Sequence, residues 1–94
     1  MNKSQVISAW STGRSGRTAN GSLTASLDGT LRSYNLVIGM RTDNDLIVGD
    51  FTTKGGAFYS MTTSHHVSNA RQVATLVDTS TLTAALNATL PSLA

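Results

Sequence analysis

The sequence predicts a small α+β domain, in which a three- to four-stranded antiparallel sheet is covered on one face by one amphipathic helix. Apolar and polar residues alternate at period two over much of 23–48, which is typical of half-buried strands. The later stretch 63–77 has apolar residues at helical spacing instead. Only 13% of the 94 residues are charged and Glu is absent, which disfavours a bundle of solvated helices.

The amino-terminal region is expected to begin with a short strand and a loop. Residues 5–10 have a loosely strand-like pattern with Val6, Ile7 and Trp10 as apolar anchors. The next stretch, 11–22, is rich in glycine and serine and has no large apolar side chain, so it cannot bury itself. It is therefore predicted to form a mobile loop or a wide turn.

The strands of the sheet are expected between residues 23 and 51. The alternation of 23–27, followed by Asp28-Gly29, predicts a β-hairpin, because both turn residues tolerate a positive φ. The second arm is expected to run from Leu31 through Met40. The turn composition of 42–45 then separates it from a third strand that begins at 46.

Two helices are expected in the carboxy-terminal half. An apolar stripe predicts an amphipathic helix over 63–77, capped by a hydroxyl of Thr62, Thr63 or Ser64. A second, short helix is expected from Thr79 or Ser80 to Leu86. The chain is thus interpreted as one domain over 1–86 followed by a frayed tail, 87–94.

The composition limits which cellular compartment and which kinds of covalent and metal chemistry are expected. Cysteine is absent, so the chain has neither disulfides nor thiolate metal ligands. Residues 1–10 lack the apolar core of a signal peptide, and no apolar run is long enough to span a membrane. A cytoplasmic protein without membrane contact is therefore expected.

Basic residues gather ahead of the midpoint of a chain with a net charge of +2. Arg14, Arg17, Arg32 and Arg41 are the candidate contacts to nucleic acid or phosphate. Residues 16–22 have the G-x4-G spacing of a phosphate-binding loop, but the lysine that would follow is missing and the loop leads to a predicted strand. Nucleotide hydrolysis is therefore not predicted. Two interpretations of this loop are kept: it contacts phosphate more loosely, or it only connects two elements.

The adjacent histidines His65 and His66 raise the question of metal binding or catalysis. Neighbouring residues on a helix point about 100° apart, so the two imidazoles cannot chelate one ion together. No strained G-x-S-x-G turn presents a nucleophilic serine. We therefore predict no catalytic residues, no metal and no cofactor. His66 is expected to be inward, neutral and hydrogen-bonded, and His65 outward.

Two segments resemble a family of small uncharacterised proteins from phages and related microbial genomes. They are the hairpin DG-x-L-x-SY, residues 28–34, and YS-x-TTS-x-H, residues 59–66. The resemblance implies a viral origin and matches polar positions at the junction between strand and helix. The candidate ligand contacts at that junction are Tyr59, Ser60, Thr62, Thr63, Ser64 and His65.

These features lead to a functional hypothesis with two alternatives. The first is a non-enzymatic accessory protein that contacts nucleic acid or a nucleoprotein complex. The resemblance implies that a phage encodes it, which would place it in the host cytoplasm. The alternatives are an inhibitor that blocks a host defence protein through an exposed sheet edge, and a binder of a small phosphorylated ligand. Because a small sheet leaves edges unpaired, a homodimer is also expected to be feasible.

Overall fold

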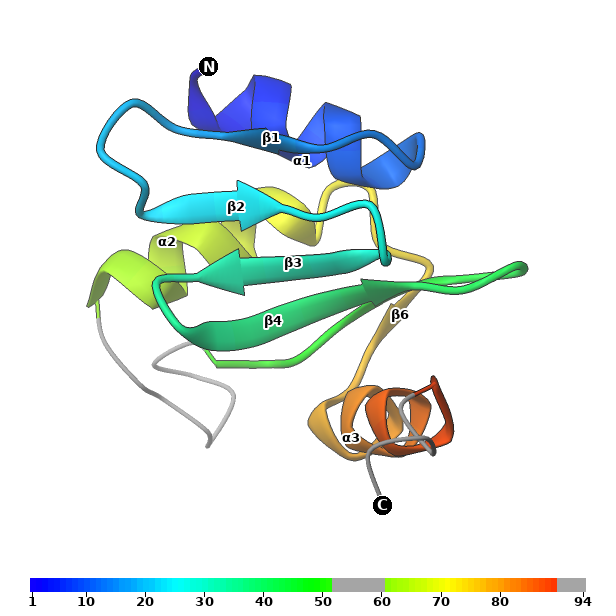
Figure 1. The fold of residues 1–94 in the computed structure, drawn as a ribbon. Coiled ribbons are helices and arrows are strands. Elements are labelled where there is room, and N and C mark those ends of the chain that lie inside the picture. Colours follow the sequence, from blue (N-terminus) through cyan, green and yellow to red (C-terminus); the bar gives the residue numbers. More distant parts are fainter. Residues whose placement is uncertain (52–60, 90–94) are drawn as a thin grey trace.

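The computed structural model describes residues 1–51 and 61–89, which form an α+β domain (Figure 1). Within these residues a six-stranded sheet has the order β1-β2-β3-β4-β5-β6, so spatial order follows chain order. All neighbouring strands are antiparallel except β5 and β6, which are parallel. The strands are β1 (Gly16–Arg17), β2 (Leu23–Ala25), β3 (Thr30–Ser33), β4 (Leu36–Arg41), β5 (Leu46–Val48) and β6 (Leu76–Val77), and the helices are α1 (Lys3–Ser11), α2 (Met61–Ala70) and α3 (Thr79–Thr89). The α+β class is confirmed, but the expected number of strands and the purely antiparallel sheet are wrong.

Residues 5–10 belong to α1 and not to a strand. Asn2 caps the helix, because its side chain accepts a hydrogen bond from the Gln5 N–H while the Gln5 side chain accepts one from the Asn2 N–H. Val6, Ile7, Ala9 and Trp10 are buried. This spacing fits one face of a helix, and a short apolar run alone did not distinguish it from a strand.

The glycine-rich stretch contributes a strand to the sheet. Gly16 and Arg17 of β1 pair with Ala25 and Thr24 of β2. The chain returns through a turn in which the Thr18 hydroxyl donates to Asn20 Oδ1 at 2.9 Å and accepts the Leu23 N–H at 3.2 Å. The loop expected over 11–22 is therefore partly ordered by pairing with the next strand.

The predicted hairpin at Asp28-Gly29 is confirmed, but its second arm is two strands and not one. Gly29 has a φ of 95°, which glycine adopts without steric cost. β3 ends at Ser33, which pairs with Leu36 at the start of β4, so Tyr34 and Asn35 form a two-residue turn. The strand predicted from Leu31 to Met40 folds back on itself there.

Helices cover both faces of the sheet, which corrects the single covered face that we expected. α1 and α2 pack on one face, where Val6, Trp10 and Val67 join residues of β2–β5 in the main core. Leu82 of α3 packs with Met40 and Ile47 on the other face, over β4 and β5. Figure 1 shows α1 and α2 behind β1–β3, with α3 at the opposite end of the sheet.

The amphipathic helix is shorter than the periodicity predicts. α2 begins at Met61, so Thr62, Thr63 and Ser64 lie inside it and do not cap it, and it ends at Ala70 where we expected residue 77. The backbone of 75–78 instead follows the edge of β5, where the Thr75 N–H donates to the Leu46 carbonyl at 2.9 Å. Pairing with that open edge satisfies backbone groups on both strands, and it ends the helix.

The last helix is present and longer than expected. α3 begins at Thr79 and continues through Thr89, past the predicted end at Leu86. The Asp78 carboxylate accepts hydrogen bonds from the Thr81 N–H at 3.0 Å and hydroxyl at 2.6 Å, which fixes the first turn. None of the helices in the described ranges is both long and apolar enough to cross a lipid bilayer.

Candidate functional site

Arg17 and Arg32 lie on the same face of the sheet although fifteen positions separate them in sequence. Arg17 is paired with Thr24, and Thr24 is paired with Arg32 on the next strand. Directly paired residues point to the same side of a sheet, and neighbouring strands are about 4.8 Å apart, so the two arginine Cα atoms are about 10 Å apart. We call this face of β1–β3 the open face.

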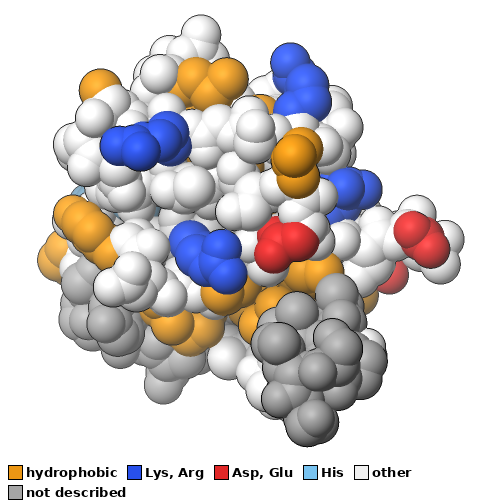
Figure 2. All heavy atoms as spheres, in the orientation of Figure 1, with side chains coloured by type: hydrophobic (Ala, Val, Ile, Leu, Met, Phe, Trp, Pro, Cys, Tyr) orange, Lys and Arg blue, Asp and Glu red, His pale blue; other side chains and the backbone are white. Residues whose placement is uncertain are grey.

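The open face is accessible to a large partner. Arg17 is exposed and Arg32 is half-buried, whereas Ala25 and Leu31, whose side chains alternate to the other face, are buried under the helices. Figure 2, in the orientation of Figure 1, shows separate patches of Lys and Arg side chains on this side of the domain, with hydrophobic and acidic patches among them. An Arg32 Nη1 atom donates to the Ser26 hydroxyl at 3.4 Å.

The other two predicted arginines are held at the carboxy-terminal end of α1. The Arg14 Nε donates to the Thr12 hydroxyl at 3.0 Å. The guanidinium of Arg41 lies against Gly13, and its Nε is buried with no hydrogen-bond partner among the described residues. The four arginines therefore form two separate pairs, and the register of the sheet brings only Arg17 and Arg32 into one row.

The predicted contacts at the junction of strand and helix are divided by burial. Tyr59 and Ser60 lie outside the described residues. Thr63 and Ser64 are buried on the inner side of α2, whereas His65 is exposed and Thr62 is half-buried. A partner that touches the surface of α2 meets His65 but neither buried hydroxyl.

The hydroxyl of Thr63 belongs to a buried polar network instead. Ser33 Oγ lies 2.9 Å from Thr63 Oγ1 and 2.7 Å from His66 Nδ1, and all three side chains are fully buried. His66 Nε2 has no hydrogen-bond partner within the described part of the chain. The expected inward, hydrogen-bonded His66 and outward His65 are thus confirmed.

The surroundings of His66 oppose its protonation. Burial is the main cause that lowers the pKa of this imidazole below 6.5, and the positive charges of Lys3 and His65 lower it further. The network also places a hydroxyl beside an imidazole, as in a nucleophilic pair. Because Ser33 and His66 are both fully buried, however, this pair is out of reach of a substrate.

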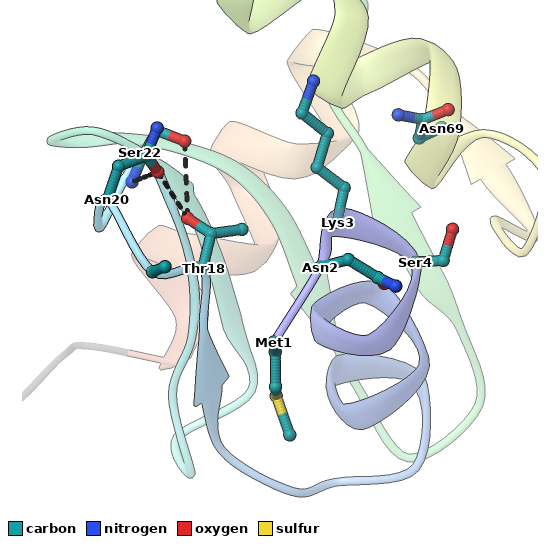
Figure 3. Close-up of a pocket in the computed structure, with 9 residues that line it drawn as sticks. Met1, Asn2, Lys3, Ser4, Thr18, Asn20, Ser22 and Asn69 are labelled. Carbon is teal, nitrogen blue, oxygen red and sulfur yellow. Dashed lines mark hydrogen bonds between the residues drawn. The ribbon is translucent and has the colours of Figure 1, made fainter.

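A pocket of about 580 Å³ lies beside the start of α1 (Figure 3). Its walls are the first turn of α1, the turn after β1 and one residue of α2, and it is lined by Met1, Asn2, Lys3, Ser4, Thr18, Ala19, Asn20, Ser22 and Asn69. Figure 3 shows Thr18, Asn20 and Ser22 of this wall hydrogen-bonded to one another. The arginines predicted to hold phosphate do not line this pocket.

The sequence did not indicate Thr24 as a member of a site. Thr24 joins the two arginines only through the strand register, which no local pattern encodes. Tyr34 is exposed over 54% of its surface, in the two-residue turn after β3. Its position two residues after Arg32 is visible in the sequence, but the turn that presents it is not.

No three histidine or acidic side chains lie close enough together to hold a metal ion in the described part of the structure. Comparison of the chain with protein-family models, with curated proteins and with solved structures gave no match. The resemblance to phage proteins therefore stays a prediction.

Proposed function

We propose that this protein is a non-enzymatic binding module that contacts nucleic acid through the open face. The observation that carries the proposal is the row Arg17–Thr24–Arg32, in which two guanidinium groups flank a hydroxyl on neighbouring strands. Guanidinium groups donate to phosphate oxygens in a bidentate fork, and a threonine hydroxyl donates to them as well. The row thus offers three donor side chains, two guanidinium groups and one hydroxyl, to one phosphodiester backbone.

The charges around the row favour a polyanion. The whole chain has seven basic and five acidic residues, with a net charge of +2. Asp28 is the acidic group whose charge interacts with Arg32, and its carboxylate already accepts hydrogen bonds from the Thr30 N–H and hydroxyl. Arg17 has no such acidic neighbour among the described ion pairs, and Arg71–Asp50, at 4.0 Å, lies elsewhere.

The experiment is a salt titration of binding to fluorescein-labelled oligonucleotides, measured by fluorescence polarisation. For a single strand, each phosphate contact contributes about −0.7 to the slope of log K against log salt. We expect Arg17→Gln and Arg32→Gln each to weaken binding and to make the slope less steep by about that amount. Arg71→Gln removes the same charge from the end of α2 and is the matched control.

Two results with the wild-type protein would remove this proposal. One is the absence of oligonucleotide binding at low salt, and the other is binding whose affinity does not change with salt. Loss of affinity in Arg71→Gln equal to that in Arg17→Gln would also contradict it, because the effect would then follow net charge and not the row.

A second candidate is the binding of a protein strand along β6, and it rests on the exposure of that edge. Leu76 and Val77 are 41% and 37% exposed in an edge strand of two residues. An unpaired edge can accept a strand of another protein or of a second copy. Binding of this kind would be insensitive to salt, and a mass measurement in solution would reveal a homodimer.

A further inference from the structure

We infer that the nucleic acid is single-stranded and that Tyr34 stacks on one of its bases. This inference rests on the proposed function and names the class of nucleic acid. The turns at the two ends of β3 each present one large apolar side chain that is more than half exposed. These are Leu27 before the strand and Tyr34 after it. The exposed ring of Tyr34 has a π face that any base can stack on.

The backbone of Tyr34 is held in a conformation that its side chain disfavours. Its φ is 55°, and among the described residues Tyr34 alone has a positive φ without being glycine. At the first position of a two-residue turn between antiparallel strands, glycine or asparagine normally supplies a positive φ. A bulky residue in this region is strained and persists only where its surroundings impose it.

Two contacts impose that conformation and fix where the ring is presented. Ser33 pairs with Leu36 on either side of the turn, and the Tyr34 N–H donates to the Ser22 carbonyl at 2.8 Å. The turn is therefore anchored to both neighbouring strands. More than half of Tyr34 stays exposed, so burial stabilises this side chain only in part and packing alone does not account for a tyrosine here. A ligand that stacks on it would.

The turn that holds Tyr34 adjoins the Arg32 end of the arginine row. Tyr34 follows Arg32 by two residues, so their Cα atoms are at most about 7 Å apart, and it lies in the turn directly beyond the end of β3. Asp28 lies at the opposite end of β3, before Thr30. Its negative charge repels phosphates at that end, so a bound strand is favoured toward the Tyr34 end of the row.

This combination distinguishes single strands from duplexes. A duplex keeps its bases stacked on one another, and exposing one of them to an outside ring requires unstacking. A single strand presents unstacked bases beside a flexible backbone, so a ring and two guanidinium groups can be contacted together. The open face therefore fits single-stranded DNA or RNA.

The test compares three probes of equal length, which are an oligothymidine, an abasic single strand and a duplex. The oligothymidine and the abasic strand have the same backbone charge and differ only in their bases. Alanine substitution at base-stacking rings weakens binding by about 5- to 150-fold. We expect the wild-type protein to bind the abasic strand and the duplex more weakly than oligothymidine, the abasic strand by a factor in that range.

The matched variants are Tyr34→Gly and Tyr34→Phe. Glycine removes the ring and adopts the positive φ without strain, so this variant is expected to fold, which its melting temperature checks. Tyr34→Gly should lose oligothymidine affinity while its affinity for the abasic strand is unchanged. Tyr34→Phe keeps the ring and should retain oligothymidine binding.

Each contrary result has a separate meaning. Equal, salt-dependent binding of oligothymidine and the abasic strand would overturn the stacking inference and leave the proposed function standing. Undiminished binding by Tyr34→Gly, or tighter binding of the duplex, would have the same consequence. Failure of all three probes to bind at low salt would overturn the proposed function itself.

Discussion

Protonation of the buried His66 should make folding stability depend on pH in a narrow window. In the unfolded chain this imidazole has its ordinary pKa of about 6.5, whereas burial, Lys3 and His65 lower its pKa in the folded protein. Below about pH 6.5 the unfolded chain therefore binds more protons than the folded one. The free energy of unfolding falls as the pH is lowered from about 6.5 through the folded-state pKa. The stabilisation that the neutral His66 contributes is fully present above about pH 6.5.

The size of the effect follows from one proton. While the unfolded imidazole is charged and the folded one is neutral, the slope is at most about 1.4 kcal/mol per pH unit. A change of 1 kcal/mol moves the melting temperature of a domain of this size by about 4–8 °C. The described carboxylates with lowered pKa act at a lower pH, because their stabilisation is lost only as the pH falls below about 4.

The assay is urea unfolding at a series of pH values between about 7.5 and about 5. His66→Asn removes the titrating group and keeps an amide within reach of Ser33. The free energy of unfolding of this variant should be lower than that of the wild type, and it should change less with pH. His65→Asn changes the exposed neighbour and should keep most of the slope. A wild-type protein whose stability is flat over this range, or a His66→Asn protein that keeps the full slope, would refute the reasoning.

Four further substitutions test packing and hydrogen bonding. His65→Ala should change the melting temperature little, whereas His66→Ala should lower it by several degrees because it empties a fully buried site, and equal losses would contradict the assigned orientations. Gly39→Ala places a methyl group 2.9 Å from a Trp10 ring carbon and should cost about 1–3 kcal/mol in urea unfolding, so an unchanged midpoint would show that the ring moves freely. Thr75→Val removes the hydroxyl that accepts the Leu46 N–H at 2.9 Å and should cost about 1 kcal/mol, and a neutral result would show that water replaces the bond.

Local chemistry predicted the parts of the fold that depend on neighbouring residues. The hairpin turn at Asp28-Gly29 and the turn over 42–45 were identified because their residue types fit the backbone that each turn requires. The inward orientation of His66 followed from helical periodicity. The first helix was missed because the apolar residues of 5–10 fit a strand as well as a helix.

The remaining features depend on residues that are distant in sequence. The end of α2 is determined by the open edge of β5, about thirty residues earlier, and this edge pairs with 75–78. The contact between Ser33 and His66 joins positions 33 apart. The row of Arg17 and Arg32 exists because a two-residue strand forms within a glycine-rich stretch. Composition indicated basic contacts, but only the register showed which arginines lie together.

The parallel pair of β5 and β6 makes one end of the domain separable from the rest. β6 is two residues long, and its backbone is hydrogen-bonded to β5 alone among the described strands. α3 follows it directly and covers Met40 and Ile47. If β6 detaches, α3 can leave with it while β1–β5 remain paired under α1. Such a partial opening would expose the small apolar core over β4 and β5, and amide hydrogens of β6 would exchange with solvent before those of β3 and β4.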